Sequence, residues 1–381
     1  YVAPRLARRN CTTPLVLVDG GKYEAHISDE WASAPIGSAY LAEPVNSPGV
    51  FHPKVNLYAS DQSVYYTVTS ANLTLAEYCD TVQIGQSGGL QESWLDDDER
   101  DLGDIPVVAR EIRDYFSALA ETPWITGAEA QNYIDETTER LDWLDNIEDT
   151  SRSTYFVTNL DGSIIDQVTS QIGSVETAQM SAPFWGSPEM MEKLSSRINP
   201  ESIEFIVEDK NTDLEIDHLQ SVLNCDYNLR KLTHDAARWV HAKVLVLNGS
   251  WGSACLFGSP NMTGAALLAD ASNGNTEAGL LRIEEEPEYF DMIDSPDEGT
   301  GSVLTGEAFR FSVSDPVEGD AIIRRENDYE GWERNRPSLE LRLLDARLSA
   351  ADEDGESTLH LSLEGATGTT ELMVTTADGT A

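Results

Sequence analysis

The chain has 381 residues, and its 67 acidic residues against 25 basic ones give a formal net charge of −42. A hydrophobic content of 40% with 13 tyrosines argues against an acidic disordered chain and predicts two or three packed domains. No apolar run approaches the roughly 18–20 residues of a membrane span, no basic and then apolar leader opens the sequence, and the four cysteines form no Cys-x-x-Cys pair. We therefore expect a cytoplasmic protein without a disulfide framework.

The first part of the chain combines short strands with later helices. The predicted strands cover residues 14–18, 37–45, 52–58 and 64–69. The predicted helices cover residues 105–120 and 127–147. In the third strand, alternation places His52 and Lys54 on one face, because side chains two apart in a strand point the same way. We expect these elements to form a first lobe over residues 1–150.

The second part alternates strands and helices, which is typical of an α/β unit. The predicted strands cover residues 155–158, 178–184, 203–207, 240–247 and 254–257. The predicted helices cover residues 164–172, 190–198 and 214–223. We expect a second lobe over residues 151–290.

The local composition of the sequence changes after residue 284, where acidic, proline- and glycine-rich stretches indicate a linker. Alternating runs follow and predict a β-rich C-terminal domain over residues 300–381. The predicted fold is thus α/β, with two lobes that each hold a mixed β-sheet flanked by helices, plus this β-rich unit. The sequence opens at Tyr1 without a methionine and stops abruptly at Ala381. We expect truncation of the first lobe and of the C-terminal domain.

One motif occurs twice. A His-x-Lys triplet is followed, 20 positions after the histidine, by an asparagine in a Ser-x-Asn triplet. The residues that recur, all at an offset of 189, are His52 and His241, Lys54 and Lys243, Ser70 and Ser259, and Asn72 and Asn261. One copy would be a weak signal, but two copies in register predict a duplicated half-site.

The two half-sites together suit chemistry on a phosphodiester. Imidazole is a nucleophile and a general acid near neutral pH. One histidine can attack phosphorus while the other protonates the leaving oxygen. Lysine and asparagine side chains can hold the non-bridging oxygens as charge builds up, so no metal or other cofactor is required.

Lysine is scarce in this chain, with six residues, and two of the six stand in the repeated motif. Such retention favours a role in the site for Lys54 and Lys243. The acidic, lysine-poor composition resembles that of proteins from halophilic archaea. In molar salt the Debye length shrinks to about 3 Å, so a large negative charge does not exclude nucleic acid as a partner.

The paired motifs resemble those of the phospholipase D superfamily, over about residues 14–283. The resemblance is carried by His52, Lys54, Ser70, Asn72, His241, Lys243, Gly258, Ser259 and Asn261. It implies two α/β lobes with the active site between them and a covalent phosphohistidine intermediate. It also implies that the site residues bind or transform a phosphodiester, with Ser70 and Ser259 among the substrate-binding residues.

The chain departs from the family's common pattern at the aspartate that follows the His-x-Lys triplet. Ala59 and Asn248 stand at those positions. The departure disfavours the lipid-metabolising branches and is similar to the tyrosyl-DNA phosphodiesterases and to prokaryotic phospholipase D-like nucleases. In the latter pattern, Glu277 of the Asn-Thr-Glu triplet orients a histidine. Asp80 is its expected counterpart in the first lobe.

We predict a metal-independent phosphodiesterase, acting as a nuclease or DNA-end-processing enzyme. His52 is assigned as the nucleophile and His241 as the general acid and then base. The reverse assignment stays open because Glu277 would favour His241. Arg238 is a candidate contact for the phosphate backbone of the substrate.

Two alternatives remain at this stage. One is a phospholipid phosphodiesterase or transphosphatidylase, and the other is a non-catalytic interaction module of a defence or repair complex. The expected partners are nucleic acid, with DNA favoured, and a helicase or another defence or repair protein.

Overall fold

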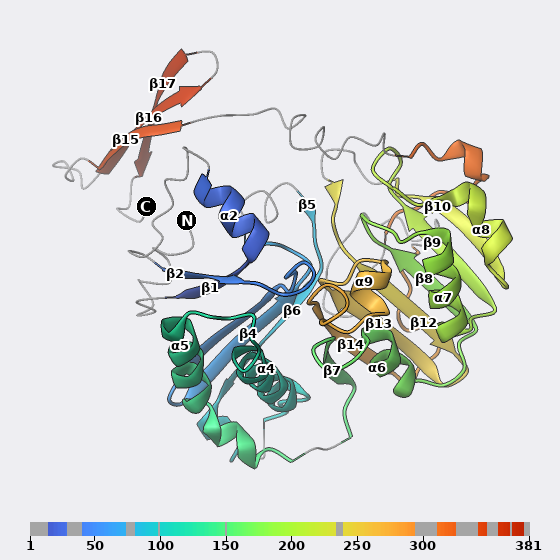
Figure 1. Cartoon of the computed structure of the whole chain (residues 1–381), viewed down its shortest axis with the longest axis horizontal. Helices are drawn as coiled ribbons and strands as arrows, with labels where there is room; N and C mark the ends of the chain where they lie inside the picture. Colours follow the sequence, from blue (N-terminus) through green and yellow to red (C-terminus); the bar gives the residue numbers. More distant parts are fainter. Residues whose placement is uncertain are drawn as a thin grey trace. The chain divides into compact units, whose positions relative to one another are not determined.

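The computed structural model describes residues 14–28, 40–73, 81–97, 100–148, 151–233, 239–293, 311–324, 342–348, 357–365 and 368–376. Contacts divide the chain into two compact units, Tyr1–Arg324 and Arg325–Ala381. The first unit is a mixed α/β structure that contains both copies of the repeated motif (Figure 1). The predicted boundaries at residues 150 and 290 stay predictions.

A seven-stranded mixed sheet dominates the second part of the first unit, with strand order β10-β9-β8-β12-β13-β14-β7. Its strands are β7 (Thr154–Thr158), β8 (Thr177–Ser181), β9 (Ser202–Val207), β10 (Asp226–Lys231), β12 (Val244–Gly249), β13 (Gly252–Gly258) and β14 (Ala278–Glu284). Strands β8, β9 and β10 run parallel, whereas the pairings from β8 through β12, β13 and β14 to β7 are antiparallel. This mixed pattern confirms the predicted α/β class.

Both faces of this sheet are buried. Val244 and Val246 of β12 belong to one apolar cluster, and Leu245 and Leu247 belong to another. The second cluster is covered by helices α6 (Ile164–Ser170), α7 (Pro188–Ile198), α8 (Ile216–Val222) and α9 (Gly264–Leu267). A strand buried on both faces reads as a continuous apolar run, and this explains the sequence of β12.

The described part of the first unit also contains three smaller sheets, which are separate from the seven-stranded one. The elements are β1 (Leu15–Asp19), α2 (Gly20–Ser28), β2 (Leu41–Val45), β3 (Val55–Ser60), β4 (Ser63–Thr69), β5 (Thr81–Val82), β6 (Gly85–Gln91) and β11 (Trp239–Val240). The antiparallel order is β3-β4-β6, and the parallel pairs are β1 with β2 and β5 with β11. The last pair joins a strand that precedes the second motif to one that follows the first motif.

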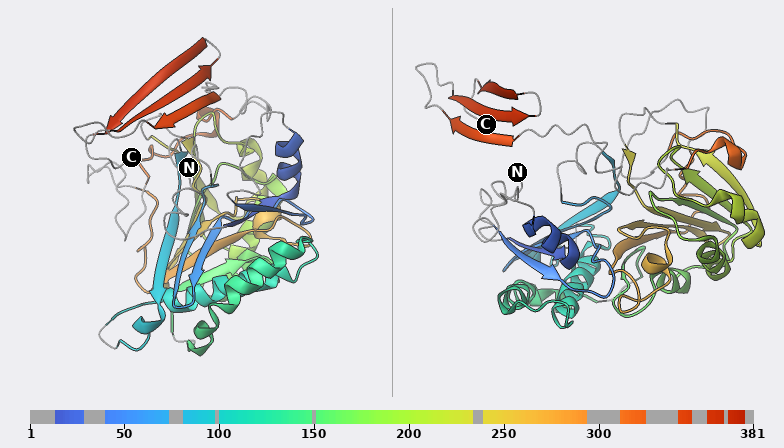
Figure 2. Two further views of the ribbon diagram at one scale, coloured as in Figure 1. Left: turned by 90° about the vertical axis from the view of Figure 1, so that its left-hand side faces the viewer. Right: turned by 45° about the horizontal axis from the view of Figure 1, so that its top comes forward.

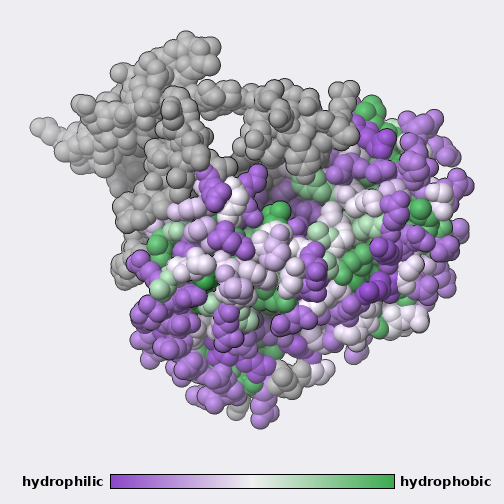
Figure 3. Space-filling model, viewed as in Figure 1, coloured by the Kyte–Doolittle hydropathy of each residue, from purple (hydrophilic) through white to green (hydrophobic). Residues whose placement is uncertain are grey.

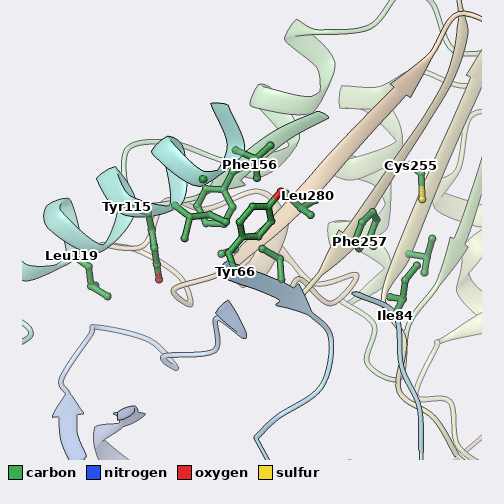
Figure 4. Packing of buried hydrophobic residues seen from close by; sticks show 14 of the residues in the cluster. Tyr66, Ile84, Tyr115, Leu119, Phe156, Cys255, Phe257 and Leu280 are labelled. Carbon is green, nitrogen blue, oxygen red and sulfur yellow. The ribbon is translucent and has the colours of Figure 1, made fainter. Parts of the chain in front are cut away.

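Helix α4 (Ile105–Ala120), drawn in teal in Figure 2, contacts β4 and β6 of the three-stranded sheet and β7 of the large sheet. Its sequence is amphipathic because one face is buried in these contacts. Its residues Val108, Ile112 and Leu119 are fully buried. They pack in a cluster with Tyr66 of β4 and Leu280 of β14 (Figure 4). Because this cluster draws on both parts of the first unit, the two predicted lobes share one hydrophobic core.

The duplication is visible in the strand bounds. β12 begins 189 positions after β3, and β13 begins 189 positions after β4. Each motif therefore leads into a hairpin of the same length. At the end of the second hairpin, Gly258 has φ +140° and a Cβ there would lie 2.6 Å from the Cα of Gly279, so glycine is required.

Some predicted elements are shorter than expected. Residues 127–147 form helix α5 (Ala128–Glu139) and then a separate 3₁₀ turn (Asp142–Asn146). The strand predicted over 178–184 ends at Ser181. The strand predicted from residue 52 begins at Val55, so the prediction that His52 and Lys54 lie in this strand is wrong. Pro53 offers no N–H to a strand partner, which agrees with the late start.

The unit Arg325–Ala381 contains three described strands, β15 (Arg342–Leu348), β16 (Ser357–Gly365) and β17 (Gly368–Thr376). They pair in that order as an antiparallel sheet.

Among the described residues, none of the helices combines the length and the apolar character that a membrane span requires. The surface seen in Figure 3 is mostly hydrophilic, with small, separate apolar patches.

Candidate active site

The two His-x-Lys triplets adopt the same local arrangement just before a strand. The Lys54 ammonium donates a hydrogen bond to the carbonyl oxygen of His52 at 2.7 Å, and Lys243 donates to that of His241 at 2.8 Å. Both lysines are buried, Lys54 being 7% exposed and Lys243 1%. A buried ammonium is costly unless it is well bonded, so these lysines are not surface residues kept for solubility.

The two histidines are held across the duplication. His52 Nδ1 lies 2.9 Å from Glu277 Oε2 and 3.1 Å from Oε1. His241 Nδ1 lies 3.2 Å from the side-chain nitrogen of Gln83. Each imidazole is thus oriented by a residue that follows the other copy of the motif, and the expectation that Glu277 would favour His241 is wrong.

Gln83 is the residue that sequence reasoning missed. Asp80, the expected counterpart of Glu277, lies outside the described residues. Gln83 comes 13 positions after Ser70, whereas Glu277 comes 18 positions after Ser259. Gln83 and Glu277 therefore share neither a residue type nor a spacing from the motif serine, so the sequence did not identify them as counterparts.

The motif serines support these two orienting residues in the same way. Ser70 donates its hydroxyl proton to Gln83 Oε1 at 2.6 Å and accepts from the N–H of Ile84 at 3.0 Å. Ser259 donates to Glu277 Oε2 and accepts from the N–H of Ala278 at 3.0 Å. Both serines are fully buried. Direct contact with substrate therefore stays a prediction for them.

These bonds determine where the protons lie. The Oε1 atom of Gln83 accepts from Ser70, so its amide nitrogen faces His241 and also donates to Thr81 Oγ1 at 2.7 Å. His241 Nδ1 is then an acceptor, and the proton of the neutral ring is on Nε2. For His52 the partner is a carboxylate, so Nδ1 carries the proton and Nε2 has the free lone pair.

The two asparagines differ in exposure. Asn72 is exposed, whereas Asn261 is 8% exposed and its Oδ1 has no hydrogen-bond partner in the described part of the chain. Arg238 lies outside the described residues. Roles for these three residues stay predictions.

Charge in the cluster shifts the pKa values of the first histidine and its partner. Burial and the nearby ammonium groups of Lys54 and Lys243 lower the pKa of His52 below its usual 6.5, against the opposing effect of Glu277. Burial opposes ionisation of Glu277, but His52, Lys54 and the hydrogen bond from Ser259 outweigh it and lower its pKa. His52 is therefore neutral and Glu277 charged at neutral pH.

Lys243 also lies close to the second imidazole, with its ammonium nitrogen 3.3 Å from Nδ1 and 3.2 Å from Nε2 of His241. An atom equidistant from both ring nitrogens cannot lie along either in-plane lone pair, so the ammonium lies over the ring. Trp239 packs against the same imidazole with ring centroids 4.7 Å apart, and Phe184 meets Trp239 edge-on at 6.4 Å. These contacts fix the plane of His241.

The position of the family's usual aspartate is not part of the site. Asn248 is 5% exposed, accepts from Ser253 and donates to the carbonyl of Phe290. Ala59 packs against the core. Among the described residues no group of three or more histidine, cysteine, aspartate or glutamate side chains could hold a metal ion.

Two basic residues near the second motif are already paired. Arg230 bonds to Glu204 at 2.6 Å, and Lys231 lies 3.5 Å from Asp209. They therefore offer less to a phosphate backbone than unpaired basic residues would.

No protein-family model matches the sequence, and no curated protein matches it. Among solved structures, one histidine variant of yeast tyrosyl-DNA phosphodiesterase is similar over 73% of this chain and 80% of its own, with a TM-score of 0.49 and 11% identity. A second variant is similar over 64% of this chain and 70% of its own, with a TM-score of 0.44 and 10% identity. Polyphosphate kinase from Porphyromonas gingivalis is similar over 72% of this chain and 36% of its own, with a TM-score of 0.35 and 9% identity. At such low scores the residues of the site, rather than the likeness, carry the functional argument.

Proposed function

We propose that the chain is a phosphodiesterase of the phospholipase D type that works through a phosphohistidine intermediate. The observation that carries this proposal is the unequal support of the two imidazoles. Glu277, a carboxylate, accepts from His52, whereas Gln83, a neutral amide, faces His241. One ring is prepared to attack and the other to donate a proton, as a two-step displacement requires.

In the first step His52 Nε2 attacks phosphorus and the P–N bond forms. The bond from phosphorus to the leaving oxygen breaks, and His241, which enters this step as the imidazolium with the Gln83 amide turned so that its oxygen accepts from Nδ1, gives its Nε2 proton to that oxygen. The carboxylate of Glu277 stabilises the positive charge that develops on His52. The ammonium groups of Lys54 and Lys243 neutralise the non-bridging oxygens.

In the second step His241, now a neutral ring with its proton on Nδ1, accepts a proton from water at Nε2. The water oxygen bonds to phosphorus, the P–N bond breaks and His52 is released. Every proton is thereby returned, and no group outside the chain and water is needed.

We assign nucleic acid as the substrate, with DNA favoured. This finer assignment rests on the form of the motifs, in which Ala59 and Asn248 replace the aspartate of the lipid-metabolising pattern. A helicase or another defence or repair protein as partner stays a prediction.

The test uses a thymidine p-nitrophenyl phosphodiester in molar KCl with EDTA, because p-nitrophenolate leaves without a proton donor. His241→Asn should still form the P–N bond but hydrolyse it slowly, so a phosphoryl adduct on His52 should accumulate and be seen by mass spectrometry. His52→Asn should form no adduct at all.

An unlabelled DNA oligonucleotide and phosphatidylcholine vesicles serve as competing natural substrates. Cleavage of the oligonucleotide, lost in both histidine variants, supports the proposal. Cleavage that persists in both variants contradicts it, and turnover of the vesicles alone would move the substrate to phospholipid.

A further inference from the structure

The segment that carries His52 is held by an unusual number of bonds. The N–H groups of three consecutive residues are all engaged: Val50 donates to Asn275 Oδ1 at 3.3 Å, Phe51 to Asp19 Oδ2 at 2.9 Å, and His52 to the carbonyl of Thr276 at 2.9 Å. The N–H of Thr276 in turn donates to the carbonyl of Val50 at 2.9 Å. The backbone ahead of His52 is therefore fixed against the segment that leads to Glu277 and then into β14.

Asn275 occupies the centre of this arrangement. Its Oδ1 accepts from Val50, and its Nδ2 donates to Glu277 Oε1 at 3.2 Å. Its own backbone is held at both ends, because its N–H donates to the carbonyl of Ala265 at 2.9 Å and its carbonyl accepts from Asn159 Nδ2 at 2.6 Å. One amide therefore contacts both the segment that carries His52 and the carboxylate that orients it.

The two segments also pack too closely for other residues. A Cβ on Gly49 would lie 2.1 Å from the carbonyl oxygen of Gly274. Real Cβ atoms do not approach so closely, so Gly49 lets the segment ahead of His52 come near enough for Asn275 to reach both partners.

We propose that Asn275 is a positioning residue for the reaction, acting through Glu277 on His52. The inference rests on the proposed function for its kinetic consequence but not for its structural one. Oε1 of Glu277 receives the Asn275 amide and Oε2 receives the Ser259 hydroxyl, while both face His52 Nδ1. The amide thus fixes the rotation of the carboxylate about its terminal bond and stabilises the charge of this fully buried group.

If Asn275 had only a structural role, that role would involve the bond to Val50 alone. The variant Asn275→Asp distinguishes this structural role from the positioning role. The aspartate keeps an oxygen for the Val50 N–H. It replaces the donor to Glu277 by a group that donates only when protonated. The charged and titratable groups facing this cluster are His52, Lys54, Lys243, Tyr115 and Asp19.

When protonated, the new carboxyl group mimics the amide, and when ionised it repels Glu277. The rate of Asn275→Asp relative to the wild type should therefore be near one at the acidic end and fall ten- to hundredfold as pH rises. The Michaelis constant should change little. Asn273→Asp is the matched control, since Asn273 is exposed and its side chain bonds to Asp270.

A second readout does not need turnover. The chain has six histidines, so NMR of ¹³C-labelled histidine, with His52→Asn to assign its signal, can follow the titration of His52. Its pKa should rise in Asn275→Asp, and also in Asn275→Ser should the aspartate variant fail to fold. It should stay unchanged in Asn273→Asp.

A pH-independent rate ratio together with an unchanged His52 titration would overturn the inference. If the wild-type protein cleaves no phosphodiester, the proposed function fails, and the titration of His52 still decides the role of Asn275.

Discussion

His52 donates from Nδ1 to Glu277 Oε2 at 2.9 Å, although 225 positions separate the two residues in the chain. The same relationship joins His241 to Gln83 with a neutral amide in place of the carboxylate. Because of this difference, the neutral His52 ring carries its proton on Nδ1 and the neutral His241 ring carries it on Nε2. The same difference predicts the effects of specific substitutions.

Glu277→Gln should lower kcat by about 10²–10⁴, the range that a positioned acid or base contributes. Ser259 would donate to the new amide oxygen, so the amide nitrogen would face His52 Nδ1 as Gln83 faces His241. The proton of His52 would then lie on Nε2, where the attacking lone pair is needed. The measurement is kcat on the p-nitrophenyl diester.

Ser259→Ala in the same background provides the control, because it lets the amide turn. The double variant should regain part of the lost rate. A Glu277→Gln variant with wild-type kcat would contradict the assignment of His52 as nucleophile.

In the wild type, kcat/KM should fall on the acidic side of its pH profile with an apparent pKa below 6.5. The nucleophile must be neutral, and burial together with Lys54 and Lys243 lowers the pKa of His52 below that value. Lys54→Met should raise the pKa of His52, as followed by NMR titration. An acid limb above pH 6.5 in the wild type would contradict this account.

The stability of the protein should also fall in mild acid. His52 has a lower pKa in the folded state than its usual 6.5, so the unfolded chain binds the proton more readily. Its contribution is present above pH 6.5 and is lost as pH falls through the folded pKa. Glu277, with a pKa below its usual 4.5, contributes in the same direction at lower pH.

The free energy of unfolding in molar KCl, measured between pH 7.5 and 5, should therefore decrease less steeply in His52→Gln than in the wild type. Parallel curves for the two proteins would contradict the expected shift.

Leu280→Ala should destabilise the first unit by about 2–5 kcal/mol, the usual cost of a buried leucine truncated to alanine. Leu280 is fully buried in the cluster that also contains Tyr66, Ile112 and Phe156. Because that cluster joins both predicted lobes, Tyr1–Arg324 should unfold in one transition in guanidinium chloride. Two separated transitions, one of them unaffected by the substitution, would show that the lobes fold independently.

Tyr66→Phe should be neutral or stabilise the protein by about 1 kcal/mol. The Tyr66 side chain is fully buried, and its hydroxyl has no hydrogen-bond partner among the described residues. Removing an unsatisfied buried hydroxyl removes its desolvation cost. Tyr65→Phe, on the exposed side of the same strand, is the control, and thermal unfolding is the measurement.

Much of this organisation was predictable because the motif is duplicated. The matching offsets identified His52, Lys54, His241 and Lys243 as candidate site residues. The periodicity of residues 105–120 predicted helix α4 with its bounds. Residue type and spacing are local signals, and these features are local.

The crossed pairing was not predictable on the same basis. Which histidine Glu277 contacts depends on how two parts of the chain pack, and Gln83 belongs to a residue type common on any surface. The start of β3 at Val55 was likewise missed. Alternation of residue types continues back to His52, but there the backbone groups bond to Thr276 and to the Lys54 ammonium instead of to a neighbouring strand.

The exchange of orienting residues between the two copies has a consequence for how such a site arises. A symmetric dimer of one copy would have this geometry, each imidazole being held by its neighbour, with identical partners by necessity. Joining the copies in one polypeptide removes that constraint, so one partner can become an acid and the other an amide. Division of labour between two equal rings is thus a property that only the fused chain can acquire.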